Sequence, residues 1–205
     1  MLLNILFMIH LIITTANIQD NFEVRREQYI KSIDRANEFS YLFDSCTILE
    51  CFSEHEQYLN DYNTYYSKIP NTYPEKGLNE MAHLKGFLQQ SHFSADDMIV
   101  KLTGRYLLED NSFFIKLGLL QENYDAIFKD DSDIYEGRGF HTFLYSVRLN
   151  TFLDTINSLN FSTDNLDPIE WGVKSFLKDY KGLYLLNRLG VKAFQGTFSD
   201  KIFSC

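Results

Sequence analysis

Proline is scarce in this sequence, and no tract resembles a linker between domains. Three prolines and ten glycines occur in 205 residues, with no low-complexity segment or internal repeat. Hydrophobic residues make up 45% of the chain and charged residues 23%, which is ordinary for a folded protein and excludes a largely disordered one. A chain of this length can bury one sizeable core, so we expect a single domain over residues 1–205.

Cysteine is also rare, and its placement argues against cross-links and zinc. The three cysteines are Cys46, Cys51 and Cys205. The number is odd, and no pair has further ligands at zinc-site spacing. We therefore expect free thiols in a reducing compartment, and a cytoplasmic protein.

Positive charge is in deficit across the chain. Nineteen lysines and arginines stand against 28 acidic residues, which gives a net charge of −9. Sequence-independent nucleic-acid binding needs a basic surface that displaces counterions, so no nucleic-acid partner is expected. A local basic pocket for an anion remains compatible with this balance and would stand out against it.

The sequence has no hydrophobic run long enough to cross a bilayer. Residues 1–17, MLLNILFMIHLIITTAN, are too short and too interrupted for a stable membrane span. Residues 1–16 could be a signal peptide for the secretory pathway, but no Lys or Arg precedes Arg25. The β-branched enrichment favours a buried first strand over 8–15. Whether the functional chain starts at Met1 or Met8 is left open.

Strand and helix patterns alternate along the rest of the chain. Expected strands cover 8–15, 41–50, 62–67, 98–102, 124–129 and 141–147, and expected helices cover 21–38, 75–90, 110–120, 149–159 and 168–180. Such alternation is typical of βαβ units, so we expect an α/β fold with a mostly parallel mixed sheet flanked by helices. Ligands of such sheets bind outside the carboxyl ends of the strands.

One of these strand ends is unusually basic. In residues 96–110, DDMIVKLTGRYLLED, strand alternation puts Lys101 and Thr103 on one face. Gly104 allows a sharp turn and a close approach to a ligand, and Arg105 adds a planar fork suited to phosphate. The sequence therefore predicts an anion site or, equally, cations that only pair with neighbouring carboxylates. Those carboxylates are Asp96, Asp97, Glu109 and Asp110.

The segment KLTGRY, preceded by the helix start EKGLNE, resembles a family of glycosyltransferase-like proteins from viral and bacterial surface-glycan gene sets. The segments IHLIITTANIQDNFEVRREQYIKSI, YDAIFK and PIEWGVKSFL also resemble that family, in order, over about residues 8–180. The resemblance implies the Rossmann-like GT-A fold of nucleotide-diphospho-sugar transferases. It also implies a donor-nucleotide half over about 8–110 and an acceptor half over about 111–205.

The implied activity is transfer of a sugar from a nucleotide-diphospho-sugar to a hydroxyl of a glycan or glycoprotein. The diphosphate would lie near the end of the fourth strand, neutralised by Lys101 and Arg105. The positions that correspond to the nucleotide-sugar contacts are Thr14, Thr15, Glu50, Lys76, Gly77, Asn79, Thr103, Gly104 and Tyr106.

The acceptor side offers fewer candidates. Glu170 matches the position of a general base that deprotonates the acceptor hydroxyl, although a helix dipole alone favours a carboxylate in a first turn. Trp171 could stack on a sugar, and His141 could contact the acceptor. For both, a place in the core is the alternative.

A metal requirement is in doubt, because enzymes with this fold typically carry Asp-x-Asp at the fourth strand to bind Mg²⁺ or Mn²⁺. This chain has Lys101-Leu102-Thr103 there instead. Metal-independent transfer is one reading, and a catalytically degenerate binding or structural protein is the other. Asp131 and Asp133 are weaker metal candidates, since acidic runs are usually solvated loops.

Overall fold

A computed structural model describes residues 7–17, 22–130, 137–194 and 202–204 of the chain. A seven-stranded sheet has the order β3-β2-β1-β4-β7-β6-β8. Its strands are β1 (Ile9–Thr15), β2 (Ser45–Glu50), β3 (Thr64–Tyr66), β4 (Met98–Thr103), β6 (Ala126–Lys129), β7 (Leu144–Arg148) and β8 (Leu183–Leu186). A second, three-stranded sheet contains β5 (Tyr106–Leu108), β9 (Val191–Phe194) and β10 (Ile202–Ser204).

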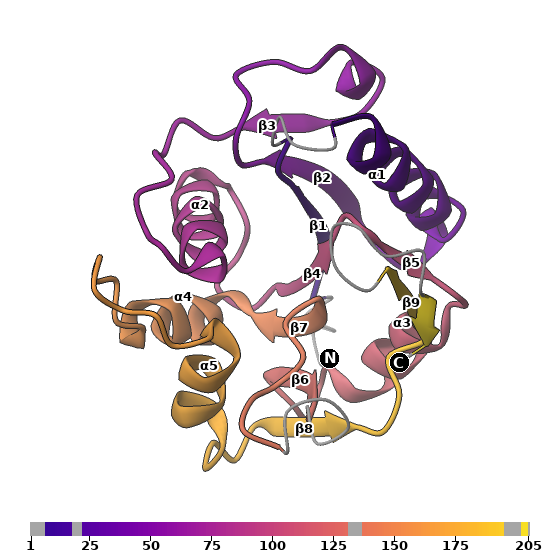
Figure 1. Ribbon diagram of the computed structural model, residues 1–205. Helices are drawn as coiled ribbons and strands as arrows, with labels where there is room; N and C mark the ends of the chain where they lie inside the picture. Colours follow the sequence, from indigo (N-terminus) through magenta and orange to yellow (C-terminus); the bar gives the residue numbers. More distant parts are fainter. Residues whose placement is uncertain (1–6, 18–21, 131–136, 195–201, 205) are drawn as a thin grey trace.

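Helices cover both faces of the large sheet (Figure 1). The helices α1 and α3 lie on one side, and α2, α4 and α5 lie on the other. Their bounds are α1 Phe22–Asn37, α2 Lys76–Gln90, α3 Ser112–Leu120, α4 Leu149–Ser158 and α5 Ile169–Leu177. Two short 3-10 helices, Ser40–Leu42 and Gln57–Leu59, flank β2.

The strand directions confirm the expected α/β fold with a mostly parallel mixed sheet. The strands β1 to β4 pair in parallel, as do β6 and β8. The strand β7 runs antiparallel to both of its neighbours, β4 and β6. The fully buried β1 pairs with both β2 and β4, so the strand interpretation of residues 8–15 is confirmed.

The core lies in two layers, one on each face of the sheet. Successive side chains of a strand point to opposite faces, and β1 follows this rule closely. Leu11 and Ile13 pack in one hydrophobic cluster with Ile33 of α1, whereas Ile12 packs in the other with Leu84 of α2. Because both faces are covered, β1 and β4 are mainly apolar before their carboxyl ends, with His10 as the exception near the amino end of β1.

The amino ends of β1, β2 and β4 are tied together by a buried polar cluster. His10 Nδ1 lies 2.7 Å from Ser45 Oγ, and His10 Nε2 lies 3.1 Å from Asp97 Oδ2. Asp97 also accepts hydrogen bonds from the backbone N–H groups of Met8 and Ser94. These bonds satisfy polar groups that burial would otherwise leave unpaired, so the cluster stabilises this edge of the sheet.

Several expected boundaries differ from those in the structure. The strand expected over 41–50 begins at Ser45, because the residues before it form a 3-10 helix. The strands β5, β8, β9 and β10 were not expected, since each has only three or four residues and β5 pairs with the distant β9. A run that short carries too little periodicity to identify a strand.

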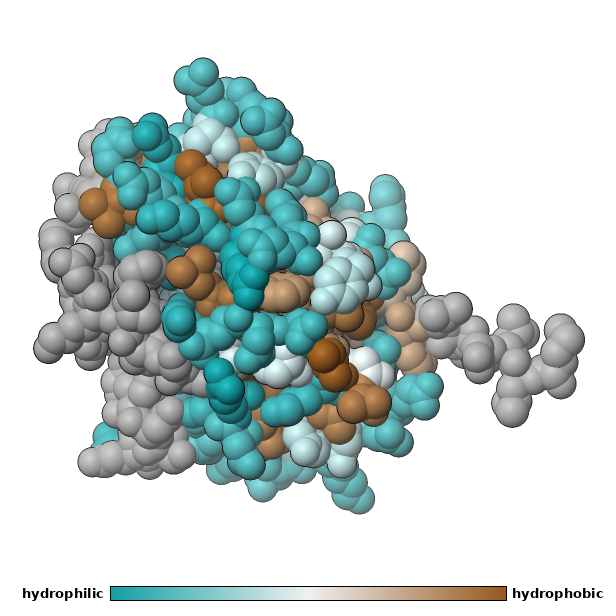
Figure 2. Space-filling model, turned by 90° about the vertical axis from the view of Figure 1, so that its right-hand side faces the viewer, coloured by the Kyte–Doolittle hydropathy of each residue, from teal (hydrophilic) through white to brown (hydrophobic). Residues whose placement is uncertain are grey.

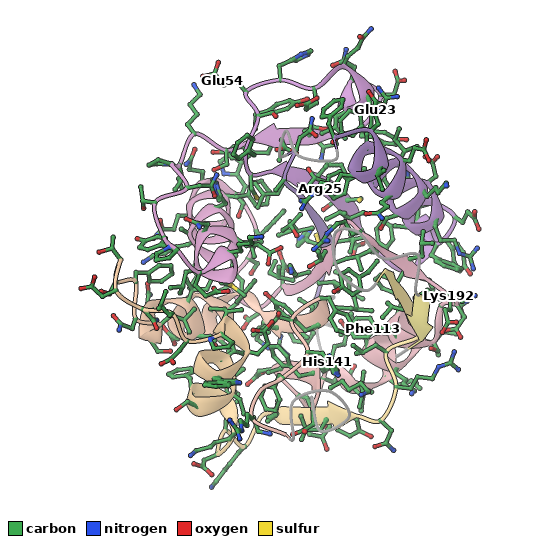
Figure 3. The ribbon with its side chains drawn as sticks, viewed as in Figure 1. Glu23, Arg25, Glu54, Phe113, His141 and Lys192 are labelled. Carbon is green, nitrogen blue, oxygen red and sulfur yellow. The ribbon has the colours of Figure 1, made fainter. Side chains whose placement is uncertain are left out.

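The outer surface of α1, α3, β5 and β9 is mainly hydrophilic, with hydrophobic side chains in small groups (Figure 2). Leu119 of α3 is one of the exposed apolar side chains. Among the described residues, no helix is both long and apolar enough to span a membrane. Arg25 of α1 behaves differently from its surface neighbours: it is buried and points inward over the sheet, whereas Glu23 lies outside (Figure 3).

Candidate functional site

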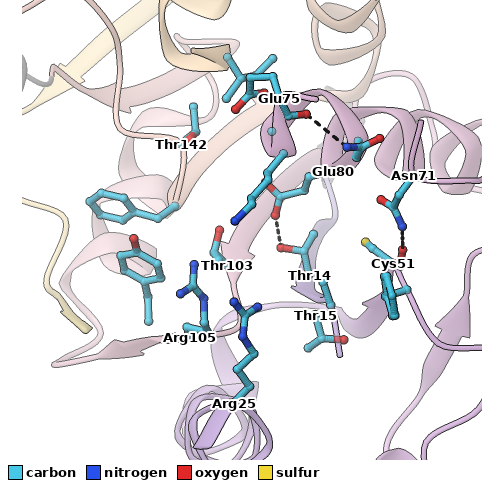
Figure 4. Close-up of a pocket in the computed structure, with 18 of the residues that line it drawn as sticks. Thr14, Thr15, Arg25, Cys51, Asn71, Glu75, Glu80, Thr103, Arg105 and Thr142 are labelled. Carbon is cyan, nitrogen blue, oxygen red and sulfur yellow. Dashed lines mark hydrogen bonds between the residues drawn. The ribbon is translucent and has the colours of Figure 1, made fainter. Parts of the chain in front are cut away.

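A cavity of about 420 Å³ opens at the carboxyl ends of β1 and β4 (Figure 4). Its walls come from α1, the turn between β4 and β5, the start of α2 and the start of α5. The sequence-predicted residues that line it are Thr14, Thr15, Lys76, Gly77, Asn79, Thr103, Arg105, Tyr106 and Glu170. The structure therefore brings most of the predicted site residues to one place, at the sheet edge where ligands of α/β folds bind.

Gly104 shapes the cavity by packing closely against β1. Its N–H donates to the Thr14 carbonyl at 2.9 Å. A Cβ at this position would lie 2.9 Å from that carbonyl oxygen and 3.0 Å from Tyr29 Cδ1. The glycine is thus needed because the turn lies against the chain itself. This contact fixes where the following Arg105 leaves the backbone.

Two arginines face the cavity from different elements. Arg105 follows β4, Arg25 comes from α1, and both line the cavity (Figure 4). Within the described part of the chain, the Arg105 side chain makes no hydrogen bond or ion pair. Burial raises the pKa of Tyr29, and the positive charges of Arg105 and Arg25 act against that rise. Both guanidinium groups therefore create a positive potential at the same wall.

Lys101 lies behind this wall. It is 1% exposed, and its ammonium group donates to Thr103 Oγ1 at 2.5 Å and to the Thr142 carbonyl at 2.7 Å. It also forms an ion pair with Glu80 of α2, with 2.9 Å between Nζ and Oε1. Glu80 in turn accepts a hydrogen bond from the hydroxyl of Thr14. The ammonium group of Lys101 thus has three partners within the protein.

The nearby carboxylates that could have paired with these cations are engaged elsewhere. Asp97 belongs to the cluster around His10, and Glu109 and Asp110 lie close to Arg188. Lys101 is therefore paired, as one interpretation of the sequence expects, but with Glu80 of another element.

Glu170 occupies the first turn of α5 and lines the cavity. Burial raises the pKa of its carboxyl group, while a hydrogen bond from the hydroxyl of Thr142 at 2.8 Å acts in the opposite direction. A carboxyl group with a raised pKa in a cavity is suited to proton transfer near neutral pH. The same threonine accepts from Lys101 through its carbonyl oxygen, so Thr142 joins these two groups.

Glu50 has a different position from the other predicted contacts. It is 0% exposed and is not among the residues that line the cavity. Its carboxylate accepts from the hydroxyl of Thr15 at 2.6 Å and from the backbone N–H groups of Asn17, Phe52 and Ser53. Four donors satisfy the carboxylate from within the chain, so Glu50 holds the loops that follow β1 and β2.

The start of α2 is held in place by short-range contacts. Glu75 caps the helix by accepting from Leu78 N–H at 2.7 Å, and Asn79 bonds both the N–H and the carbonyl of Tyr73. A Cβ on Gly77 would lie 2.4 Å from Ile169 Cγ2, so only glycine lets α2 approach α5 this closely. Gly77 and Asn79 thus position the wall of the cavity that the start of α2 forms.

Two acceptor candidates lie outside this cavity. His141 is buried, with its ring 4.7 Å from that of Phe143 and its Nε2 3.3 Å from Lys129 Nζ. Trp171 lines a second cavity on the other side of the α5 start. Asp131 and Asp133, the predicted metal candidates, lie outside the described residues.

The residues at the end of β4 do not fit a divalent cation. A cation site needs several free oxygen ligands, and an ammonium group occupies the strand end instead. Within residues 7–17, 22–130, 137–194 and 202–204, no cluster of three His, Cys, Asp or Glu side chains could hold a metal. The cavity carboxylates Glu75, Glu80 and Glu170 each have a protein partner.

Arg25, Glu80 and Thr142 were not identified from the sequence. Arg25 carried a usable signal, because it shares the buried helical stripe of α1 with Tyr29 and Ile33, where a cation is unusual. Glu80 and Thr142 had no such signal in the sequence, since their roles depend on contacts with a distant strand.

Comparisons with known proteins identify the fold. No protein-family model matches the sequence, and no curated protein sequence matches it. The 4-diphosphocytidyl-2C-methyl-D-erythritol synthase of Anaerococcus prevotii has a similar structure, with a TM-score of 0.58 and 12% identity over 88% of this chain and 86% of that one. A candidate nucleotide-diphospho-sugar transferase of Desulfovibrio desulfuricans follows, with a TM-score of 0.55 and 8% identity over 87% and 79%.

The bifunctional IspDF of Campylobacter jejuni is similar over 87% of this chain but only 49% of its own, with a TM-score of 0.53 and 10% identity. The chain thus spans about half of that protein. At these identities the likeness concerns the fold alone. The fold is that of nucleotide-diphospho-sugar transferase-like proteins, as the sequence resemblance implied.

Proposed function

We propose that this protein is a glycosyltransferase that moves a sugar from a nucleotide-diphospho-sugar to a hydroxyl of a glycan or protein. One observation carries the proposal: Arg105, whose side chain has no partner among the described residues, lines the same cavity as the buried carboxyl group of Glu170. A free cation and a carboxyl group of raised pKa are what release of a diphosphate and activation of a hydroxyl require.

The diphosphate of the donor lies at the arginine wall in this proposal. Guanidinium groups bind phosphate oxygens through paired N–H donors, and Arg105 offers such a fork, while Arg25 adds positive charge at the same wall. Lys101 does not contact the diphosphate here. Its role is to hold Glu80 and Thr103 in place, since its ammonium group bonds Thr103, Thr142 and Glu80 within the protein.

The nucleoside lies over the end of β1. The hydroxyls of Thr14 and Thr15 already donate to Glu80 and Glu50, so toward a ligand they act as acceptors. Acceptors suit the N–H and O–H groups of a base or ribose and do not suit phosphate oxygens. Glu50 contributes indirectly by orienting Thr15.

Glu170 is the proposed base in an inverting transfer. Its carboxylate takes the proton of the acceptor hydroxyl as the acceptor oxygen bonds to the anomeric carbon of the sugar. The bond between that carbon and the diphosphate oxygen breaks, and the nucleoside diphosphate leaves with the electron pair at the arginine wall. The protein's contribution is positioning and charge stabilisation.

Nucleotidyl transfer is a second candidate, because one of the similar structures is named as a synthase of a diphosphocytidyl compound. Such a reaction would join a nucleotide to a phosphorylated alcohol and release pyrophosphate. The glycosyl-transfer reaction instead releases a nucleoside diphosphate, so the products distinguish the two.

The test is an assay with a panel of UDP-, GDP- and CDP-sugars, in which released nucleoside diphosphate is measured with and without EDTA. Release of nucleoside diphosphate that Glu170→Gln reduces by about 10²-fold or more supports glycosyl transfer. Release of pyrophosphate from nucleoside triphosphates and sugar phosphates instead supports nucleotidyl transfer. Nucleotide binding without turnover of any donor identifies a catalytically degenerate binding protein.

A further inference from the structure

A second cavity, of about 490 Å³, lies between the end of α4 and α5. We call it the Trp171 groove. The aromatic side chains of Trp171 and Phe176 line it, together with the polar residues Asn160, Asp167 and Ser175. Phe176 is 43% exposed, and Ser175 is exposed as well. The groove is therefore open to solvent and combines aromatic and hydrogen-bonding surface.

The groove has the chemistry of a carbohydrate site. The faces of aromatic rings carry partial negative charge and attract the polarised C–H groups on the apolar face of a pyranose. Amide, carboxylate and hydroxyl groups at the rim can bond the sugar hydroxyls and give orientation. The lining residues include no lysine, arginine or histidine and one carboxylate, that of Asp167. This charge favours an uncharged saccharide over an anionic one.

The indole ring of Trp171 has a protein partner on one face. The guanidinium group of Arg138 lies over it, 5.9 Å from the ring centroid, and α5 fixes its backbone. One face of the ring thus has a protein partner, and we place the sugar at the other face. A ring carried on a helix binds with a smaller entropy cost than one carried on a mobile segment.

The Trp171 groove adjoins the cavity that contains Glu170. Ile169 lines both, and consecutive residues of α5 face different cavities: Glu170 the first and Trp171 the second. Gly172 brings α5 close to α4, because a Cβ there would lie 2.8 Å from Leu159 Cδ2. A saccharide on Trp171 could therefore extend past the start of α5 toward Glu170.

We propose that the Trp171 groove binds a neutral saccharide of two or more sugar units. Its identity as the acceptor, with a hydroxyl delivered to Glu170, rests on the proposed function. Binding of the saccharide in the groove does not rest on the proposed function, because this binding needs no nucleotide.

The chain offers a direct test, because Trp171 is its one tryptophan and all tryptophan emission therefore comes from this ring. The purified full chain is titrated with maltotriose, cellotriose, chitotriose and lactose, with sialyllactose as an anionic comparison. We expect a saturable change of tryptophan emission with at least one neutral saccharide. Calorimetry with that saccharide then compares Trp171→Ala, in which we expect affinity to fall by about tenfold or more, with Trp171→Phe, which keeps a ring and part of the affinity.

Leu166→Ala is the matched control, since Leu166 is 74% exposed but does not line the groove. It should bind the saccharide as the unchanged chain does. The proposal is overturned if no neutral saccharide gives a saturable signal, or if Trp171→Ala binds as tightly as the parent. UDP and GDP binding, measured on the same variants, should be unaffected by Trp171→Ala. Saccharide binding without any nucleotide binding would refute the proposed function while leaving the saccharide site intact.

Discussion

Lys101 Nζ lies 2.9 Å from Glu80 Oε1, at the strand end where the fold family would have metal-binding carboxylates. Lys101 is almost completely buried, whereas Glu80 keeps 22% of its side-chain surface exposed toward the cavity. The pair joins α2 to β4, and Thr14 extends it to β1. An ion pair inside the protein thus uses the ammonium group of Lys101, and in the proposed function Arg105 supplies the positive charge for the diphosphate instead.

Glu80→Gln should destabilise the fold, because it leaves the buried ammonium group without its counter-charge. Loss of one partner of a buried pair costs about 3–5 kcal/mol in the free energy of unfolding. Urea unfolding followed by circular dichroism measures this. Glu27→Gln is the control, since the Glu27–Lys31 pair is exposed and should change stability by less than about 1 kcal/mol. Equal stability of the two variants would contradict the structural role of the Lys101–Glu80 pair.

Gly104→Ala should destabilise the protein by about 1–3 kcal/mol, because the added methyl group would overlap with the Thr14 carbonyl and the Tyr29 ring. Gly118→Ala provides the opposite case. Gly118 lies in α3, and a Cβ there would meet no atom within 4 Å. Alanine at that helical position should stabilise by about 0.5–1 kcal/mol. Thermal unfolding of both variants checks the signs, and a neutral or stabilising Gly104→Ala would refute the close packing of this turn.

Glu170→Gln should make the protein relatively more stable as pH rises. Burial holds the pKa of Glu170 above its ordinary value of about 4.3, so folding favours the protonated form. The stability from this group is complete below the unfolded pKa and is lost as pH rises through the folded pKa. Glutamine stays neutral and avoids that loss. Chemical unfolding between about pH 4 and pH 7 should show the variant gaining on the parent; a constant difference across this range would contradict a raised pKa.

Thr142→Val should raise the pKa of Glu170 further, because it removes the hydroxyl that stabilises the carboxylate. The acidic limb of the pH–rate profile for sugar transfer should then move to higher pH. Thr142→Ser keeps a hydroxyl donor and should restore the parent profile. A change in rate at all pH values with no movement of the limb would mean that Thr142 acts only through structure.

The sheet and most helices were predictable because their signals are local. β-branched runs and helical apolar stripes lie within single elements, and the sheet edge then follows from the rule for parallel strands. Thr14, Arg105 and Glu170, which the sequence predicts as site residues, line one cavity in the structure. The sequence could not show that Lys101 forms an ion pair with Glu80, because that contact depends on how α2 packs on the sheet. It also missed Arg25, whose place on the buried stripe of α1 was a readable signal.

Glu50 illustrates the other limit of sequence reasoning. A carboxylate at the end of a strand looks the same in a sequence whether it faces a ligand or its own loops. Only the backbone paths after β1 and β2 decide this, and here they turn one and two N–H groups, respectively, toward Glu50.

Isothermal titration of the protein with UDP, GDP and CDP tests whether the arginine wall binds a diphosphate. We predict saturable binding of at least one nucleoside diphosphate, weakened about tenfold or more in Arg105→Ala, because a charge-assisted hydrogen bond to phosphate is lost. Arg188→Ala, which removes an exposed arginine on the same protein, should bind as the parent does. Absence of binding for all three nucleotides, or equal affinity in Arg105→Ala and the parent, would contradict the account.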